Sequence, residues 1–197
     1  MNIAVFASHG GSDLQAIIDG CKSSQINARV AAVISNNGNS MALQRAKNEN
    51  IPAYHLSAKN CGSEDKLAEK LLFVLEQHEI DMIFLAGYMK MLHVSVLERF
   101  EKRIFNIHPA LLPKFGGKGM FGMNVHRAVI EAKEAESGVT IHRVSAEYDS
   151  GEIVAQTTVP VLSEDTAETL AARVLEREHS FLVEVIADIA NALIPLS

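Results

Sequence analysis

The stretch Phe105-Asn106-Ile107-His108-Pro109-Ala110-Leu111-Leu112-Pro113 ends an apolar run and leads into a segment bounded by prolines. Asn106 and His108 are two residues apart, so an extended chain directs both side chains to the same side. Pro109 and Pro113 restrict the path that follows and favour extended geometry in the residues before them. An amide beside an imidazole suits acyl transfer, in which one group stabilises an oxyanion and another moves a proton. The same pair is also typical of polar side chains that bond to backbone where a strand ends.

Around this stretch, short apolar segments alternate with segments of helical periodicity. The predicted parallel strands cover residues 3–7, 30–34, 53–56, 82–86 and 103–107. Residues 139–145 and 153–159 predict a strand pair, and a long helix is expected to begin at Asp165 or Thr166. The order predicts an α/β fold: a Rossmann-like, mostly parallel central sheet with helices on both faces, a C-terminal strand pair and a long closing helix.

The predicted fold also predicts where a ligand binds. Ligands of mostly parallel sheets bind beyond the carboxyl ends of the strands. We therefore expect residues 8–11, 87–88 and 106–108 to line one crevice. Because 197 residues suffice for one substantial core and no linker or repeat interrupts them, residues 1–197 are predicted to form a single domain.

Composition excludes several classes of protein. The formal charge is −6 and lysine and arginine form no cluster, which argues against nucleic acid or an acidic membrane as partner but permits a small anion. No apolar run approaches about 18 residues, and the chain start resembles a strand and not a signal peptide. The two cysteines form no framework and the histidines show no ligand spacing, so we expect a cytoplasmic protein without a metal.

The segment Ser8-His9-Gly10-Gly11-Ser12-Asp13 joins the first predicted strand to the first predicted helix. Glycines let backbone amides approach a ligand, and a helix N-terminus favours an anion, so the segment could hold a phosphate. It is equally typical of a plain turn in which Ser12 or Asp13 caps the helix.

Four further features are weak evidence of function by themselves. Asp149 lies in the turn Glu147-Tyr148-Asp149-Ser150-Gly151, and an aspartate before glycine is common in plain turns, although it could orient a histidine. His142 could be a satisfied histidine on a strand. The residues that follow Gly87, Tyr88-Met89-Lys90-Met91-Leu92, suit either core packing or a flat apolar ligand, and Glu178 either faces solvent or accepts from sugar hydroxyls.

Taken together and in this order, these segments resemble the phosphoribosylglycinamide formyltransferase family of folate-dependent enzymes. The resemblance runs from Met1 to about Asp188, and its most specific part is the stretch from Phe105 to Pro113. The glycine-serine loop, Leu85-Ala86-Gly87-Tyr88-Met89 and the segment from Gly138 to Gly151 narrow it to this family. It implies transfer of a formyl group from 10-formyltetrahydrofolate to glycinamide ribonucleotide in purine biosynthesis, by a monomer or homodimer.

The resemblance also implies roles for individual residues. The catalytic residues would be Asn106, His108 and Asp149, with His142 in a secondary role. The substrate would bind Gly11, Ser12, Asp13, Gly87, Pro109 and Glu178, of which the first three form the phosphate loop and Glu178 holds the ribose. The formyl folate would bind Met89, Lys90, Met91, Leu92, Ser145, Ala146, Glu147 and Tyr148. Asp149 would keep His108 cationic so that it stabilises the oxyanion together with Asn106.

Two residues depart from the family pattern, and other functions stay open. Asp13 stands where the family usually has asparagine, and His9 replaces a small residue. A formyltransferase acting on another amine, such as an amino sugar nucleotide, would keep the three catalytic residues and change this loop. A transformylase of methionyl-tRNA should carry an extra domain and a basic surface, and a formyl folate hydrolase an additional N-terminal domain. A non-catalytic binding protein of the same fold would bind without turnover.

Overall fold

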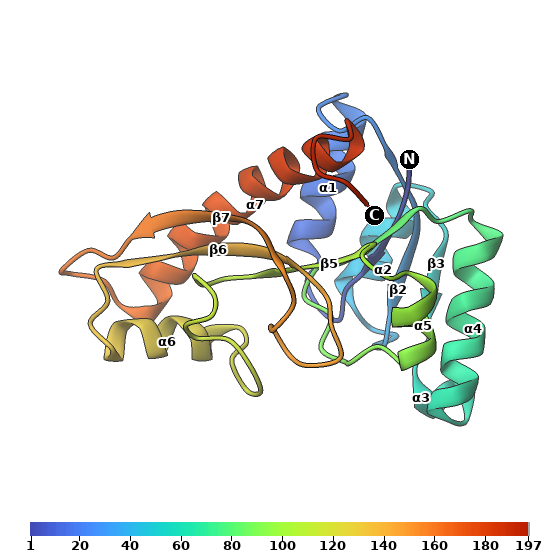
Figure 1. The fold of residues 1–197 in the computed structure, drawn as a ribbon, viewed down its shortest axis with the longest axis horizontal. Coiled ribbons are helices and arrows are strands. Elements are labelled where there is room, and N and C mark those ends of the chain that lie inside the picture. The colour runs from blue at the N-terminus through green and yellow to red at the C-terminus, as the bar shows by residue number, and fades with distance from the viewer. Residues whose placement is uncertain (197) are drawn as a thin grey trace.

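A seven-stranded sheet in the order β3-β2-β1-β4-β5-β6-β7 forms the centre of the computed structural model, which describes residues 1–196 (Figure 1). The strands are β1 (Asn2–Phe6), β2 (Arg29–Ser35), β3 (Ala53–His55), β4 (Met82–Leu85), β5 (Ile104–His108), β6 (Glu136–Arg143) and β7 (Ile153–Pro160). Strands β1 to β5 pair in parallel, whereas β6 is antiparallel to both β5 and β7. The predicted mostly parallel sheet with a C-terminal strand pair is confirmed.

Seven helices connect and cover these strands within the described residues. They are α1 (Ser12–Lys22), α2 (Met41–Asn48), α3 (Ala58–Cys61), α4 (Glu64–Gln77), α5 (Val94–Arg99), α6 (Met123–Glu131) and α7 (Ala167–Ala190). Thr166, one of the two residues at which this helix was expected to begin, caps the long helix α7 through a capping box with Thr169. The short helix α3 was not predicted, because a single turn held by a capping box of Ser57 and Asn60 shows no periodicity.

The two faces of the sheet bury alternate residues of each strand. Ile3 and Val5 of β1 pack with α1, α2, α6 and α7, whereas Ala4 and Phe6 pack with α4 and α5. Figure 1 shows α1 beside α7 on one side of the sheet and α4 with α5 on the other. Phe84 of β4 is fully buried, and truncating such a side chain to alanine typically costs about 3–5 kcal/mol of folding free energy.

The topology creates a crevice at the carboxyl ends of β1 and β4. Strand order runs outward from β1 in both directions, with β2 and β3 on one side and β4 to β7 on the other, which is the switch point where such sheets bind ligands. Two hydrogen bonds join the loops there: the Ser8 N–H donates to the Gly87 carbonyl at 3.1 Å, and the Met89 N–H to Ser8 Oγ at 2.8 Å. These loops therefore form one wall.

The start of α1 differs from the prediction. Gly11 is its N-cap residue, with φ at 68°, and neither Ser12 nor Asp13 caps the helix with its side chain. A Cβ atom on Gly11 would lie 2.9 Å from both Cα and Cβ of Ala42 in α2, so only glycine fits this left-handed position without displacement. The Asp13 carboxylate therefore does not cap its own helix.

Among residues 1–196, no helix is both long and apolar enough to cross a bilayer. The longest, α7, has charged residues between its buried apolar ones.

Candidate active site

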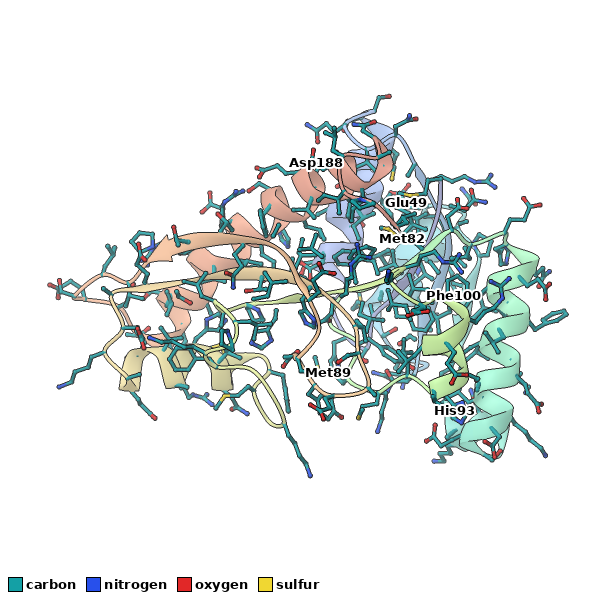
Figure 2. All side chains as sticks on the ribbon, viewed as in Figure 1. Glu49, Met82, Met89, His93, Phe100 and Asp188 are labelled. Carbon is teal, nitrogen blue, oxygen red and sulfur yellow. The ribbon has the colours of Figure 1, made fainter. Side chains whose placement is uncertain are left out.

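A cavity of about 740 Å³ opens at this edge of the sheet. Fifteen of the residues predicted from the sequence line it: Asp13, Gly87, Met89, Lys90, Met91, Leu92, Asn106, His108, Pro109, His142, Ser145, Glu147, Tyr148, Asp149 and Glu178. The structure does not place Gly11, Ser12 or Ala146 on its wall. In Figure 2, Met89 marks this side of the molecule, at the lower edge of the view and far from Asp188.

Asn106 and His142 meet because of the register between two antiparallel strands. Asn106 of β5 is the direct partner of His142 in β6, so the two side chains lie on one face of the sheet. His142 Nδ1 lies 2.8 Å from the Arg143 carbonyl, which can only accept, so Nδ1 carries a proton. In the neutral ring Nε2 then accepts from Asn106 Nδ2 at 3.0 Å. The second proton on Asn106 Nδ2 stays available for another acceptor.

His108 is held between a carbonyl and a carboxylate. Its Nε2 lies 2.8 Å from the Phe115 carbonyl and must therefore donate to it. Its Nδ1 lies 3.8 Å from Asp149 Oδ2, so Nδ1 is the atom that takes up and releases a proton. The side chain is buried, with only 5% of it exposed.

Asp149 bridges the two histidines from the turn between β6 and β7. Its Oδ1 lies 3.5 Å from His142 Nε2, and its Oδ2 accepts from the Gly117 N–H at 2.9 Å. Asp149 and Phe115 both have positive φ angles, 52° and 56°, which are uncommon for residues other than glycine. The two groups that contact His108 thus both come from residues in the left-handed backbone region.

Gly116 lies where Asp149 and Leu112 approach the chain. A Cβ atom at Gly116 would lie 2.5 Å from Leu112 Cδ2 and 3.2 Å from Asp149 Cβ. A larger residue would therefore require the Leu112 side chain to move and would press against Asp149.

Burial shifts the pKa of His108 in the direction opposite to the prediction. Desolvation lowers the pKa of His108, and it outweighs the Asp149 carboxylate and the bond to the Phe115 carbonyl, which both raise it. The direction of this shift favours the neutral imidazole, against the expectation that Asp149 keeps His108 cationic. Asp149 instead is ready to stabilise a proton that arrives on Nδ1.

Asp149 itself remains ionised. Burial raises the pKa of Asp149, but the neighbouring His142, the hydrogen bond from the Gly117 N–H and the positive charge that His108 and His142 acquire when protonated outweigh burial and hold its pKa below the ordinary value. The site thus places a fixed negative charge beside a neutral imidazole.

Another part of the cavity is apolar and exposed. Among the described residues, eleven large hydrophobic side chains are exposed, and five of them line this cavity: Met89, Met91, Phe121, Tyr148 and Leu175. Exposed apolar side chains that line one cavity favour a ligand with an apolar part.

A third part of the cavity is acidic. Asp13 of α1 and Glu178 of α7 are both buried, at 9% and 8% exposure, and both line the cavity. Burial raises the pKa of Glu178 well above its usual value, and the charge of Asp13 and a hydrogen bond between the two carboxyls add to this. His179 Nε2 lies 3.4 Å from Asp13 Oδ1.

Sequence reasoning missed several groups of the site. The Phe115 carbonyl and the Gly117 N–H are backbone groups, which no side-chain pattern reveals. His126 of α6 lines the cavity with a buried Nδ1 that has no partner, and its only signal was an isolated histidine on a helix. Among residues 1–196, no group of three or more histidine, cysteine, aspartate or glutamate side chains is arranged to hold a metal ion.

Comparison with known proteins agrees with this geometry. Residues 1–186 match the family described as formyl transferase. Phosphoribosylglycinamide formyltransferase of Haemophilus influenzae is 41% identical over 93% of this chain and 84% of its own length. The structure of glycinamide ribonucleotide transformylase 1 from Symbiobacterium toebii superposes with a TM-score of 0.90 at 37% identity, covering 98% of this chain and 88% of that one.

Two plant relatives are longer than this chain. Chloroplastic phosphoribosylglycinamide formyltransferase of Arabidopsis thaliana is 43% identical over 96% of the chain, which spans 65% of its length, and the protein from Vigna unguiculata is 44% identical, with 59% of its length spanned. The match to the family covers nearly the whole chain all the same. The chain therefore belongs to the formyl transferase family, and the resemblance to phosphoribosylglycinamide formyltransferases found in its sequence is confirmed.

Proposed function

We propose that this protein transfers the formyl group of 10-formyltetrahydrofolate to the amine of 5'-phosphoribosylglycinamide, which gives formylglycinamide ribonucleotide in de novo purine biosynthesis. The observation that carries the proposal is the convergence of Asn106, His108 and Asp149 on one cavity. Family membership and the names of the relatives support it.

The mechanism uses the two groups that remain available in this site, the second N–H of Asn106 Nδ2 and the Nδ1 atom of His108. The acceptor amine attacks the formyl carbon, and the formyl oxygen becomes an oxyanion that accepts a hydrogen bond from the second N–H of Asn106 Nδ2. Losing one such donor typically costs about 3–4 kcal/mol of transition-state stabilisation. His108 Nδ1 takes the proton from the amine, and Asp149 stabilises the imidazolium that forms. That proton then passes to the folate nitrogen as its bond to the formyl carbon breaks.

The remaining lining residues would hold the two substrates. Met89 to Leu92 and Ser145 to Tyr148 would take the formyl folate, with its flat ring on the exposed apolar side chains. Gly11, Ser12, Asp13, Gly87, Pro109 and Glu178 would take the ribonucleotide, with the phosphate at the start of α1 and the ribose hydroxyls on Glu178. We further propose a cytoplasmic monomer or homodimer that acts on small molecules alone.

A spectrophotometric transfer assay with 10-formyl folate and glycinamide ribonucleotide tests the proposal. We expect deformylation that requires the acceptor and disappears in His108→Ala. Deformylation without acceptor would identify a hydrolase instead, and turnover with a different amine alone would identify another acceptor. Binding of both compounds without turnover would mean a binding protein of the same fold.

A further inference from the structure

Three residues of neighbouring strands form one row across the sheet. His108 of β5 is the direct partner of Thr140 in β6, and Thr140 is the direct partner of Gln156 in the edge strand β7. Residues that oppose one another on adjacent strands project to the same face of the sheet. The row therefore connects the edge of the sheet to the imidazole that is proposed to move the proton.

Gln156 holds the segment that follows His108. Its Nε2 donates to the Leu112 carbonyl at 2.9 Å and to Thr140 Oγ1 at 2.8 Å, which uses both of its N–H groups. Because the Leu112 carbonyl can only accept, the orientation of the Gln156 amide is fixed. Thr140 Oγ1 also accepts from the Leu112 N–H at 3.1 Å and donates to the Ala110 carbonyl at 2.6 Å. Both backbone polar groups of Leu112 are thus bonded to this row.

Leu112 passes this constraint to the backbone beside His108. A Cβ atom at Gly116 would lie 2.5 Å from Leu112 Cδ2, so the Leu112 side chain lies directly against Gly116. The neighbouring Phe115 carbonyl accepts from His108 Nε2 at 2.8 Å, and this bond keeps Nδ1 available for proton transfer. A displacement of Leu112 would therefore disturb the group that orients the imidazole.

We propose that Gln156 is a positioning residue for formyl transfer, which holds Leu112 in place and, through it, the Phe115 carbonyl that orients His108. Gln156 does not line the cavity, so it acts on the reaction without touching a substrate. This inference rests on the proposed function, because it takes His108 as the group that accepts the amine proton.

Gln156→Met tests the role of the side-chain amide, because it keeps an unbranched side chain of similar length and removes both donors. We expect kcat to fall about tenfold, since a misplaced catalytic group loses rate, while the KM of each substrate stays within about twofold of wild type. Steady-state kinetics of the transfer reaction measures both constants.

Histidine NMR of the protein without substrates gives a readout that a loss of stability alone does not move. Long-range proton–nitrogen correlation spectra show which ring nitrogen of His108 carries the proton, and His108→Ala assigns its signals. The wild type should carry the proton on Nε2, because the Phe115 carbonyl can only accept. In Gln156→Met we expect a mixture of the two neutral forms and a lower pKa of His108, because the bond to the Phe115 carbonyl raises that pKa.

Val159→Ala is the matched control. Val159 lies in the same strand as Gln156, is buried in the core and points to the opposite face of the sheet. Its truncation weakens β7 without removing any bond to Leu112 or Thr140. We expect it to keep the kcat of the wild type and the wild-type proton position and pKa of His108.

Gln156→Glu keeps the shape of the side chain in case Gln156→Met does not fold. Its ionised carboxylate cannot donate to the Leu112 carbonyl, so kcat and the proton position on His108 should change in the same way. A folded Gln156 variant with wild-type kcat and a proton on Nε2 alone would overturn the inference, as would equal changes in Val159→Ala. If the wild type transfers no formyl group, the proposed function fails, whereas the spectra of His108 still decide its link to Gln156.

Discussion

The cavity has two polar ends, and they are built in opposite ways. At the β5–β6 end, Asn106, His108 and Asp149 each have a protein partner at hydrogen-bond distance. At the α1–α7 end, Asp13 Oδ1 and His179 Nε2 lie 3.4 Å apart but outside hydrogen-bond geometry, and neither has another partner. A fully hydrogen-bonded network holds its groups in one arrangement, whereas groups without such bonds are held less firmly. The comparison indicates chemistry at the first end and recognition at the second.

The largest expected effect concerns His108 at the β5–β6 end. His108→Ala removes the group that accepts the amine proton, so kcat should fall by about 10²- to 10⁴-fold with little change in KM. Steady-state kinetics of the transfer reaction measures both. His55→Ala, which removes an exposed histidine outside the cavity, is the control. A loss of affinity at unchanged kcat would move His108 from catalysis to binding.

The next effect concerns Asn106. Asn106→Ala removes the oxyanion donor, and kcat should fall by about 10²- to 10³-fold. It also leaves His142 Nε2 without its donor, so unfolding by denaturant should show a loss of about 1–3 kcal/mol. A stable variant with full kcat would contradict both roles. A stability loss alone would make Asn106 a residue that only holds His142.

The pH dependence of kcat tests the role of Asp149. Its charge raises the pKa of His108, so Asp149→Asn should lower that pKa further and move the acidic limb of the kcat profile to lower pH. The lost hydrogen bonds should also reduce kcat about tenfold to hundredfold, since bonds to charged groups contribute about 1.5–3 kcal/mol. Asp65→Asn, at an exposed aspartate 3.4 Å from His93, is the matched control. An unmoved limb would mean that Asp149 does not act through His108.

The smallest expected effect is on the stability of the protein and concerns Asp13 and Glu178 at the α1–α7 end of the cavity. The pKa of Glu178 is raised by burial and by Asp13, so the folded protein keeps a proton that the unfolded chain has released. Stability from this proton is full below the ordinary glutamate pKa of about 4.3 and is lost as pH rises through the raised pKa. Asp13→Asn should therefore gain about 1 kcal/mol over wild type at pH 8 and less at pH 4, measured by thermal unfolding. The same difference at both pH values would contradict the coupling of the two carboxyls.

The sequence by itself determined the layer order of the fold and the most specific stretch of the site. Alternating periods of apolar residues predicted every strand, and the stretch from Phe105 to Pro113 predicted that Asn106 and His108 lie on the same side of their strand, because strand periodicity is local. The single turn α3 was missed, and Gly11 and not Ser12 or Asp13 caps α1, because packing against Ala42 decides that position.

Only the tertiary structure decided what depends on distant pairing and burial. The β5–β6 register places His142 opposite Asn106, the turn after β6 brings Asp149 to His108, and the packing of α1 on α7 sets Asp13 against Glu178. Local patterns carry no information about such contacts. Burial also acts on charge: it lowers the pKa of His108 and favours a neutral imidazole where the sequence suggested a cation, because desolvation outweighs the carboxylate beside it.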